Sequence, residues 1–155
     1  MTSPVLLCAD GSHHSTAALA AGVALLDPAT PLIVVTVMAE PDPTLVTGSG
    51  MAGGVMSPEA FDQLEREAGQ DATDVASQTR AELGLADRAE ARVLQGDPAT
   101  AICQLATELD ASAVVIGSRG HGGIKRAVLG SVSDHVVRNA PCTVIVTGPK
   151  AGAED

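Results

Sequence analysis

Three glycines and a serine are spaced in a way that suits the binding of phosphate groups. Gly117, Gly120 and Gly130 are separated by two and then nine residues, and Ser131 follows directly. Glycine adopts positive φ readily and lets a ligand approach backbone amides closely. Successive amides in such a turn bind anions, and the N-terminus of a following helix adds further amides and the positive end of its dipole. The stretch therefore predicts a site for a polyphosphate.

Two familiar phosphate fingerprints do not match this stretch. A P-loop has Lys and then Ser or Thr directly after its last glycine, whereas here Lys125 is displaced and is followed by Arg126. The dinucleotide-binding pattern GxGxxG is absent, and the glycines are expected after the fourth strand rather than the first. Neither fingerprint therefore describes the site.

Short apolar runs alternate with longer helical patterns, which is typical of βαβ units. We expect strands at residues 4–9, 32–38, 89–95, 112–117 and 142–147. We expect helices at residues 12–26, 57–83, 97–109 and 130–139. The second of these helices places one set of residues along a single face: Phe61, Leu64, Ala68, Ala72, Val75 and Leu83.

These elements predict an α/β fold, a doubly wound, Rossmann-like parallel sheet of five strands with helices on both faces. In the common strand order 3-2-1-4-5, a crevice opens between the first and fourth strands at their carboxyl ends. Asp10 and Gly11 leave the first strand there, and the glycine-rich stretch leaves the fourth. The third strand is less apolar than the others, which favours a place near an edge.

Composition narrows the class of protein. The formal net charge is -10 and Phe61 is the single aromatic residue, so neither a cationic patch nor a stacking surface for nucleic acid is expected. Apolar runs reach only strand length and the N-terminus lacks a basic region, so we expect no membrane span and no signal peptide. Cys8, Cys103 and Cys142 lack CxxC spacing, which predicts buried thiols in a reducing compartment. We expect one cytoplasmic domain, residues 1–155.

Two segments depart from the alternation of strands and helices. Residues 39–56 contain two prolines and four glycines, which predicts a mobile loop of the kind that serves as a lid or a binding loop. Residues 148–155 are expected to form a frayed tail.

The spacing Gly117-x2-Gly120-x9-Gly130-Ser131, between the fourth strand and the fourth helix, resembles the G-x2-G-x9-G-[S/T] signature of ATP-binding universal stress proteins. Residues 5–11 and 143–146 also resemble the two ends of that family's domain. The resemblance covers nearly the whole chain and is least convincing at residues 39–56. It implies a domain that binds ATP together with a divalent cation, Mg2+ or Mn2+.

The resemblance also assigns positions to the site. Asp10 matches the family's acidic residue at the nucleoside end, and Val37 matches the position whose backbone meets adenine. The residues that match the phosphate-holding loop and helix start are Gly117, Gly120, Gly130, Ser131 and Val132. The family further implies homodimers that pair through the last strand, here Cys142 to Thr147.

Structural roles compete with these assignments. Ser131 has the spacing of an N-cap with Asp134 as its reciprocal partner, and Asp10 has the type and position of a turn or cap residue. Arg119 and the two basic residues at 125–126 suit either phosphate binding or a solvated surface. The four histidines lack metal-site spacing, so no metal ligand is assigned.

Three functions remain to be compared. The first is a regulatory, ATP-binding protein of the stress response, with at most slow hydrolysis, because no positioned base for phosphoryl transfer is evident and no catalytic residue is assigned. The second is an ATPase or phosphotransferase in which Asp10 holds the metal. The third is a dimeric interaction module that binds no ATP. Cyclic AMP is an alternative ligand.

Overall fold

The computed structural model describes residues 2–38, 40–48, 55–119 and 129–148. The strands are β1 (Val5–Cys8), β2 (Leu32–Met38), β3 (Ala89–Gln95), β4 (Ala113–Gly117) and β5 (Thr143–Thr147). The helices are α1 (His13–Val23), α2 (Thr44–Thr47), α3 (Pro58–Glu82), α4 (Pro98–Glu108) and α5 (Ser131–Asn139).

The strands form one parallel sheet in the order β3-β2-β1-β4-β5, which confirms the predicted topology. Cys8 at the end of the central strand lies opposite Val35 of β2 and Ile116 of β4. β3 and β5 are the edge strands. The weaker apolar character of the third strand indicated an edge position for β3. The carboxyl ends of β1, β2 and β4 therefore lie at the same edge of the sheet.

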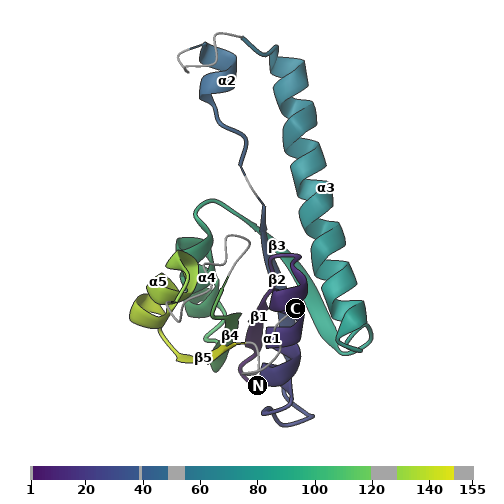
Figure 1. The fold of residues 1–155 in the computed structure, drawn as a ribbon, viewed down its shortest axis with the longest axis vertical. Coiled ribbons are helices and arrows are strands. Elements are labelled where there is room, and N and C mark those ends of the chain that lie inside the picture. The colour runs from purple at the N-terminus through teal and green to yellow at the C-terminus, as the bar shows by residue number, and fades with distance from the viewer. Residues whose placement is uncertain (1, 39, 49–54, 120–128, 149–155) are drawn as a thin grey trace.

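Helices cover both faces of the sheet, as predicted (Figure 1). Successive residues of a strand point to opposite faces, so Leu7 packs with Leu19 of α1 and Ala76 of α3, whereas its neighbour Leu6 packs on the other face. That other face is covered by α4 and α5, which contribute Ile102 and Val136. Burial on both faces explains why the central strands read as continuous apolar runs.

Side-chain caps begin three of the helices. Ser12, Ser57 and Asp97 accept hydrogen bonds from amides in the first turns of α1, α3 and α4, which satisfies donors that a helix start leaves unpaired. The predicted cap of the fourth long helix is wrong. Gly130, not Ser131, is the N-cap of α5.

Asp134 does not complete a capping box either. It forms an exposed ion pair with Arg138 at 3.0 Å, and this hydrogen bond and charge raise the pKa of Arg138. Because the Asp134 carboxylate pairs with Arg138, four positions later, it does not turn back to accept a hydrogen bond at the start of the helix.

α3 is longer than the sheet that it covers. It has 25 residues, which corresponds to about 38 Å, and Figure 1 shows its N-terminal part projecting beyond the strands. Its buried residues, Ala72, Ala76 and Thr79, all lie in the C-terminal half. Leu64, predicted on the same face, is 36% exposed, because none of the described strands extends that far.

The segment 39–56, predicted as a loop, contains the short helix α2, which packs against α3 (Figure 1). Residues 39 and 49–54 lie outside the described residues, so the predicted mobility stays a prediction. The expected tail also lies outside them, apart from Gly148.

The three cysteines are free thiols. Cys8 is buried, whereas Cys103 and Cys142 are half-buried against the same core. Burial, with a smaller contribution from the other two cysteines, raises the pKa of the Cys8 thiol from 9.0 to about 12. Burial also raises the pKa of Cys103 and Cys142. None of the three is therefore activated as a thiolate.

The raised pKa of Cys8 predicts a loss of stability at alkaline pH. Between pH 9 and 12 the unfolded chain releases a proton that the folded protein retains, so the free energy of unfolding falls as pH rises, by about 1.4 kcal/mol per pH unit for this group. Urea unfolding across this range tests the expectation. The Cys8→Ala variant should show a shallower fall, and an unchanged slope in that variant would contradict it.

Candidate functional site

Asp10 directly follows β1 and shapes the turn into α1. Its Oδ1 accepts hydrogen bonds from the amide of Ser12 at 2.8 Å and from the Ser12 hydroxyl at 2.6 Å. The Asp10 amide donates to Ser15 Oγ at 3.3 Å, and the Ser15 amide donates to Ser12 Oγ at 3.1 Å. The turn role anticipated for Asp10 is therefore present. The same bonds hold its carboxylate at the carboxyl end of β1.

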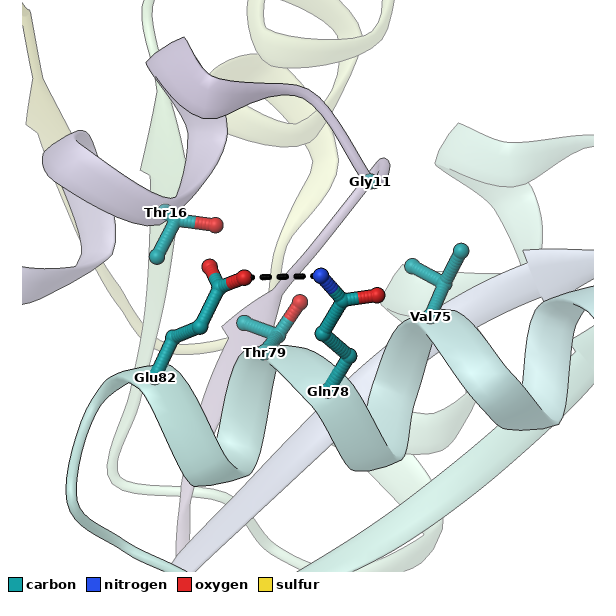
Figure 2. Close-up of a pocket in the computed structure, with 6 residues that line it drawn as sticks. All are labelled: Gly11, Thr16, Val75, Gln78, Thr79 and Glu82. Atoms are coloured by element: carbon teal, nitrogen blue, oxygen red, sulfur yellow. Dashed lines mark hydrogen bonds between the residues drawn. The ribbon is translucent and has the colours of Figure 1, made fainter.

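A small cavity lies beside Gly11 of this turn, between α1 and α3. Its volume is about 40 Å³, which holds only a few water molecules and is far below the several hundred Å³ of a nucleotide site. Figure 2 shows the lining residues, including the hydrogen bond of 2.8 Å from Gln78 to Glu82. Gly11, at φ 82, closes one end against Val75 of α3. The cavity is not the predicted phosphate site.

The backbone of Val37 points to the side of β2 on which β1 lies, two residues beyond the last pair between the two strands. The amide of Ala9 donates to the carbonyl of Val35 at 2.8 Å, and in a parallel strand alternate residues direct both backbone groups to the same neighbour. Val37 therefore directs its N–H and C=O to that side as well. Pairing of β1 with β2 stops at Cys8 and Val35, so among the described residues no strand pairs with Val37 there.

The ends of the glycine-rich loop are joined to each other. Gly117 ends β4 opposite Thr147 of β5, and the Ser118 amide donates to the Thr147 carbonyl at 2.8 Å. The Gly130 amide donates to the Ser118 carbonyl at 2.9 Å, which places the start of α5 beside the end of β4. Gly120 lies outside the described residues.

The first turn of α5 has amides that no side chain of the described residues caps. Gly130 has φ -61 and ψ 160, an extended conformation that any residue adopts, so backbone geometry does not require glycine there. The lack of a side chain leaves room for close approach instead. The amides of Ser131 and Val132 and the positive end of the dipole are groups that bind an anion.

Sequence reasoning assigned no role to Ser133, yet it is 3% exposed. Its hydroxyl donates to the carbonyl oxygens of Gly130 at 3.0 Å and Ser118 at 3.4 Å. Serine is ordinary in the first turn of a helix, so the sequence carried no signal that this one is buried at the base of the loop.

The structure thus brings most of the predicted site residues to one edge of the sheet. Asp10, Val37 and Gly117 lie at the carboxyl ends of β1, β2 and β4. Gly130, Ser131 and Val132 are joined to that edge through Ser118. The described residues contain no group of three His, Cys, Asp or Glu side chains able to hold a metal ion. The arrangement offers an anion site made of backbone groups, next to an acidic side chain.

Comparison with known proteins identifies the family. The sequence model of the universal stress protein family matches residues 1–148. The universal stress protein YxiE of Bacillus subtilis is 34% identical over 151 residues, which cover 94% of this chain and 99% of YxiE. The chain belongs to the universal stress protein family. The resemblance inferred from the glycine spacing is therefore confirmed at the level of the family.

Solved universal stress protein structures share the fold of this universal stress protein. UspA from Lactobacillus plantarum aligns with a TM-score of 0.72 at 22% identity, covering 94% of this chain and 97% of UspA. A universal stress protein in complex with cAMP aligns at 0.63 and 25% identity, covering 94% and 96%. An Arabidopsis thaliana family member with AMP bound aligns at 0.58 and 20%, covering 99% of each chain.

Every helix in the described parts of this universal stress protein is too short or too polar to traverse a lipid bilayer.

Proposed function

We propose that this universal stress protein binds ATP at the carboxyl edge of its sheet and acts as a nucleotide-dependent regulatory protein in the stress response. The observation that carries the proposal is the hydrogen bond from the Gly130 amide to the Ser118 carbonyl. It sets the start of α5, which no described side chain caps, at the end of β4, on the same edge as Asp10 and Val37. The family neighbours bound to cAMP and AMP support an adenine nucleotide as the ligand.

Each part of the nucleotide has a proposed partner. The triphosphate lies against the amides of the loop and of the first turn of α5, from Gly117 and Gly120 to Gly130, Ser131 and Val132. Adenine meets the backbone groups of Val37 on the side where no described strand pairs with them, and the nucleoside end lies near Asp10. A divalent cation, Mg2+ or Mn2+, is held mainly by phosphate oxygens, because the described residues offer no three-ligand cluster.

A regulatory role fits the chemistry of the site better than rapid turnover. Fast phosphoryl transfer needs a group that orients the attacking oxygen, and Asp10 is the single acid assigned to this edge. Its Oδ1 already accepts two hydrogen bonds from Ser12. Hydrolysis is therefore slow in this proposal, and the protein responds to bound nucleotide by a change of conformation or partner.

The proposal also covers assembly and location. The chain is one domain that acts in the cytoplasm, and two copies pair through β5 into a homodimer. β5 suits this role because it is an edge strand with half-buried side chains along most of its length, and an unpaired edge is a template for another strand. Light scattering that gives the mass of a single chain at micromolar concentration would contradict the dimer.

Calorimetric titration of nucleotide-free protein tests the central claim. With ATP and Mg2+ we expect saturable binding at one site per chain. Cyclic AMP and adenosine should bind at least about tenfold more weakly, because they present less phosphate charge to the helix start. Tighter binding of cyclic AMP would make a cyclic nucleotide the ligand.

Two further outcomes separate the remaining hypotheses. ATP turnover that disappears in Asp10→Ala while binding persists would favour the ATPase or phosphotransferase. Absence of binding for every nucleotide, with none released when freshly purified protein is denatured, would overturn the proposal and favour the interaction module.

A further inference from the structure

The carbonyl of Ser118 is the point at which the glycine-rich loop is closed. Its own amide is bonded to Thr147 of the edge strand at 2.8 Å, and its oxygen accepts from the Gly130 amide at 2.9 Å and from Ser133 Oγ at 3.4 Å. Thr147 is tied in turn to α1, because its hydroxyl donates to the Ala18 carbonyl at 2.7 Å. Ser118 is therefore anchored to the sheet, and the start of α5 is anchored to Ser118.

Ser133 is the only side chain among the described residues that bonds to both ends of this closure. Its hydroxyl reaches the carbonyls of Gly130 and Ser118 from within the first turn of α5, where it is 3% exposed. A hydroxyl has one proton to donate, so the two carbonyls share it. This sharing draws the N-cap of α5 and the end of β4 together from the helix side.

Removal of the hydroxyl would leave no acceptor without a partner. Without it, the Ser118 carbonyl still accepts from the Gly130 amide, and the Gly130 carbonyl still accepts from the Asp134 amide at 2.9 Å. Ser133→Ala should therefore fold, because the large penalty for an orphaned buried group does not arise. What it changes is how firmly the closure is held.

We propose that Ser133 is a positioning residue that holds the first-turn amides of α5 in the geometry that phosphate requires. The inference rests on the proposed function for its consequence in nucleotide binding. Its structural part, the tightening of the loop closure by the hydroxyl, can be measured without any nucleotide.

Amide hydrogen exchange measures the closure directly. In Ser133→Ala, the Gly130 amide should exchange about fivefold faster than in the wild type, which corresponds to the loss of one neutral hydrogen bond. Amides in the middle of β1 and β4 should keep their rates. Thr73→Ala is the matched control, because it removes a hydroxyl-to-carbonyl bond of 2.8 Å on α3 and should leave Gly130 unchanged. Ser133→Thr, which keeps the hydroxyl, should exchange Gly130 more slowly than Ser133→Ala does.

Nucleotide binding provides the second readout. Ser133→Ala should weaken ATP about fivefold while adenosine, which has no phosphate, keeps its affinity. A merely structural role would weaken both ligands alike, and that result would overturn the positioning role. Unchanged exchange of the Gly130 amide in Ser133→Ala would overturn the inference whether or not ATP binds. Failure of the wild type to bind ATP would instead overturn the proposed function and with it the positioning for phosphate.

Discussion

Gly130→Asp should abolish ATP binding and leave the fold intact. Gly130 is the N-cap of α5 at φ -61 and ψ 160, which any residue adopts, and Asp is among the best N-cap residues. Its carboxylate would accept hydrogen bonds from the amides that would otherwise bind the phosphate. It would also add a negative charge beside the triphosphate. We expect at least a 100-fold loss of ATP affinity by calorimetry, and a free energy of unfolding within about 1 kcal/mol of the wild type.

Gly130→Asn is the matched control for charge. Its side chain also caps the helix but is neutral, so it should weaken ATP by a smaller factor than Gly130→Asp. Equal ATP affinity in the wild type and in Gly130→Asp, with both proteins folded, would show that the start of α5 is not the phosphate site. Gly117 is less suited to this test, because a Cβ there would lie 3.4 Å from the Ala18 Cβ and larger side chains would press against α1.

Gly22→Ala should destabilise the protein although alanine is the better helix residue. Gly22 lies in α1 against β4, and a Cβ there would overlap Cγ1 of Val115. Val115 is fully buried and, as a β-branched residue, has little freedom to rotate away. The overlap costs about 1–3 kcal/mol or more and exceeds the gain of about 1 kcal/mol in helix propensity. We expect the free energy of unfolding to fall by about 1–2 kcal/mol, measured by urea unfolding.

Two further variants separate crowding from helix propensity. Gly69→Ala makes the same change in α3, where the nearest atom to a new Cβ is Met38 Sδ at 3.4 Å. It should be neutral or stabilising, because a methionine side chain can adjust. Val115→Ala should relieve the overlap, so the double variant with Gly22→Ala should lose less stability than the sum of the single changes. Additive losses would show that Gly22 and Val115 do not crowd one another.

The arrangement of elements was largely predictable because it depends on local signals. The apolar runs of the central strands reflect burial on both faces, and Ser57-Pro58 and Asp97-Pro98 mark helix starts through capping and the missing donor of proline. The strand order was expected because it is the common one for this kind of sheet, and the structure confirms it. The predicted face of α3 was correct only where a strand lies beneath it, because periodicity describes a helix surface and not what reaches that surface.

The prediction of the site was less complete. Glycine spacing located the loop, and the structure joins its ends through Ser118 and Gly130. The predicted cap at Ser131 was wrong, because Asp134 pairs with Arg138 and Gly130 takes the cap position. The burial of Ser133 went unnoticed because its partner Ser118 is 15 residues away along the chain.

The sequence by itself determined the fold class, the order of the elements and the loop in which phosphate chemistry is expected, because residue type and periodicity encode local conformation and burial. Tertiary structure alone decided which backbone groups pair with another strand, which residues are confined by packing, and which side chains bond to a distant part of the chain. On the side that faces β1, no described strand pairs with the backbone of Val37, because β1 ends first. Gly22 is confined because Val115 packs against it from another element. Ser133 reaches Ser118 because the chain returns to the end of β4. The contacts of Gly22 and Ser133 join residues far apart in the chain, and such contacts form only when the sheet and helices pack.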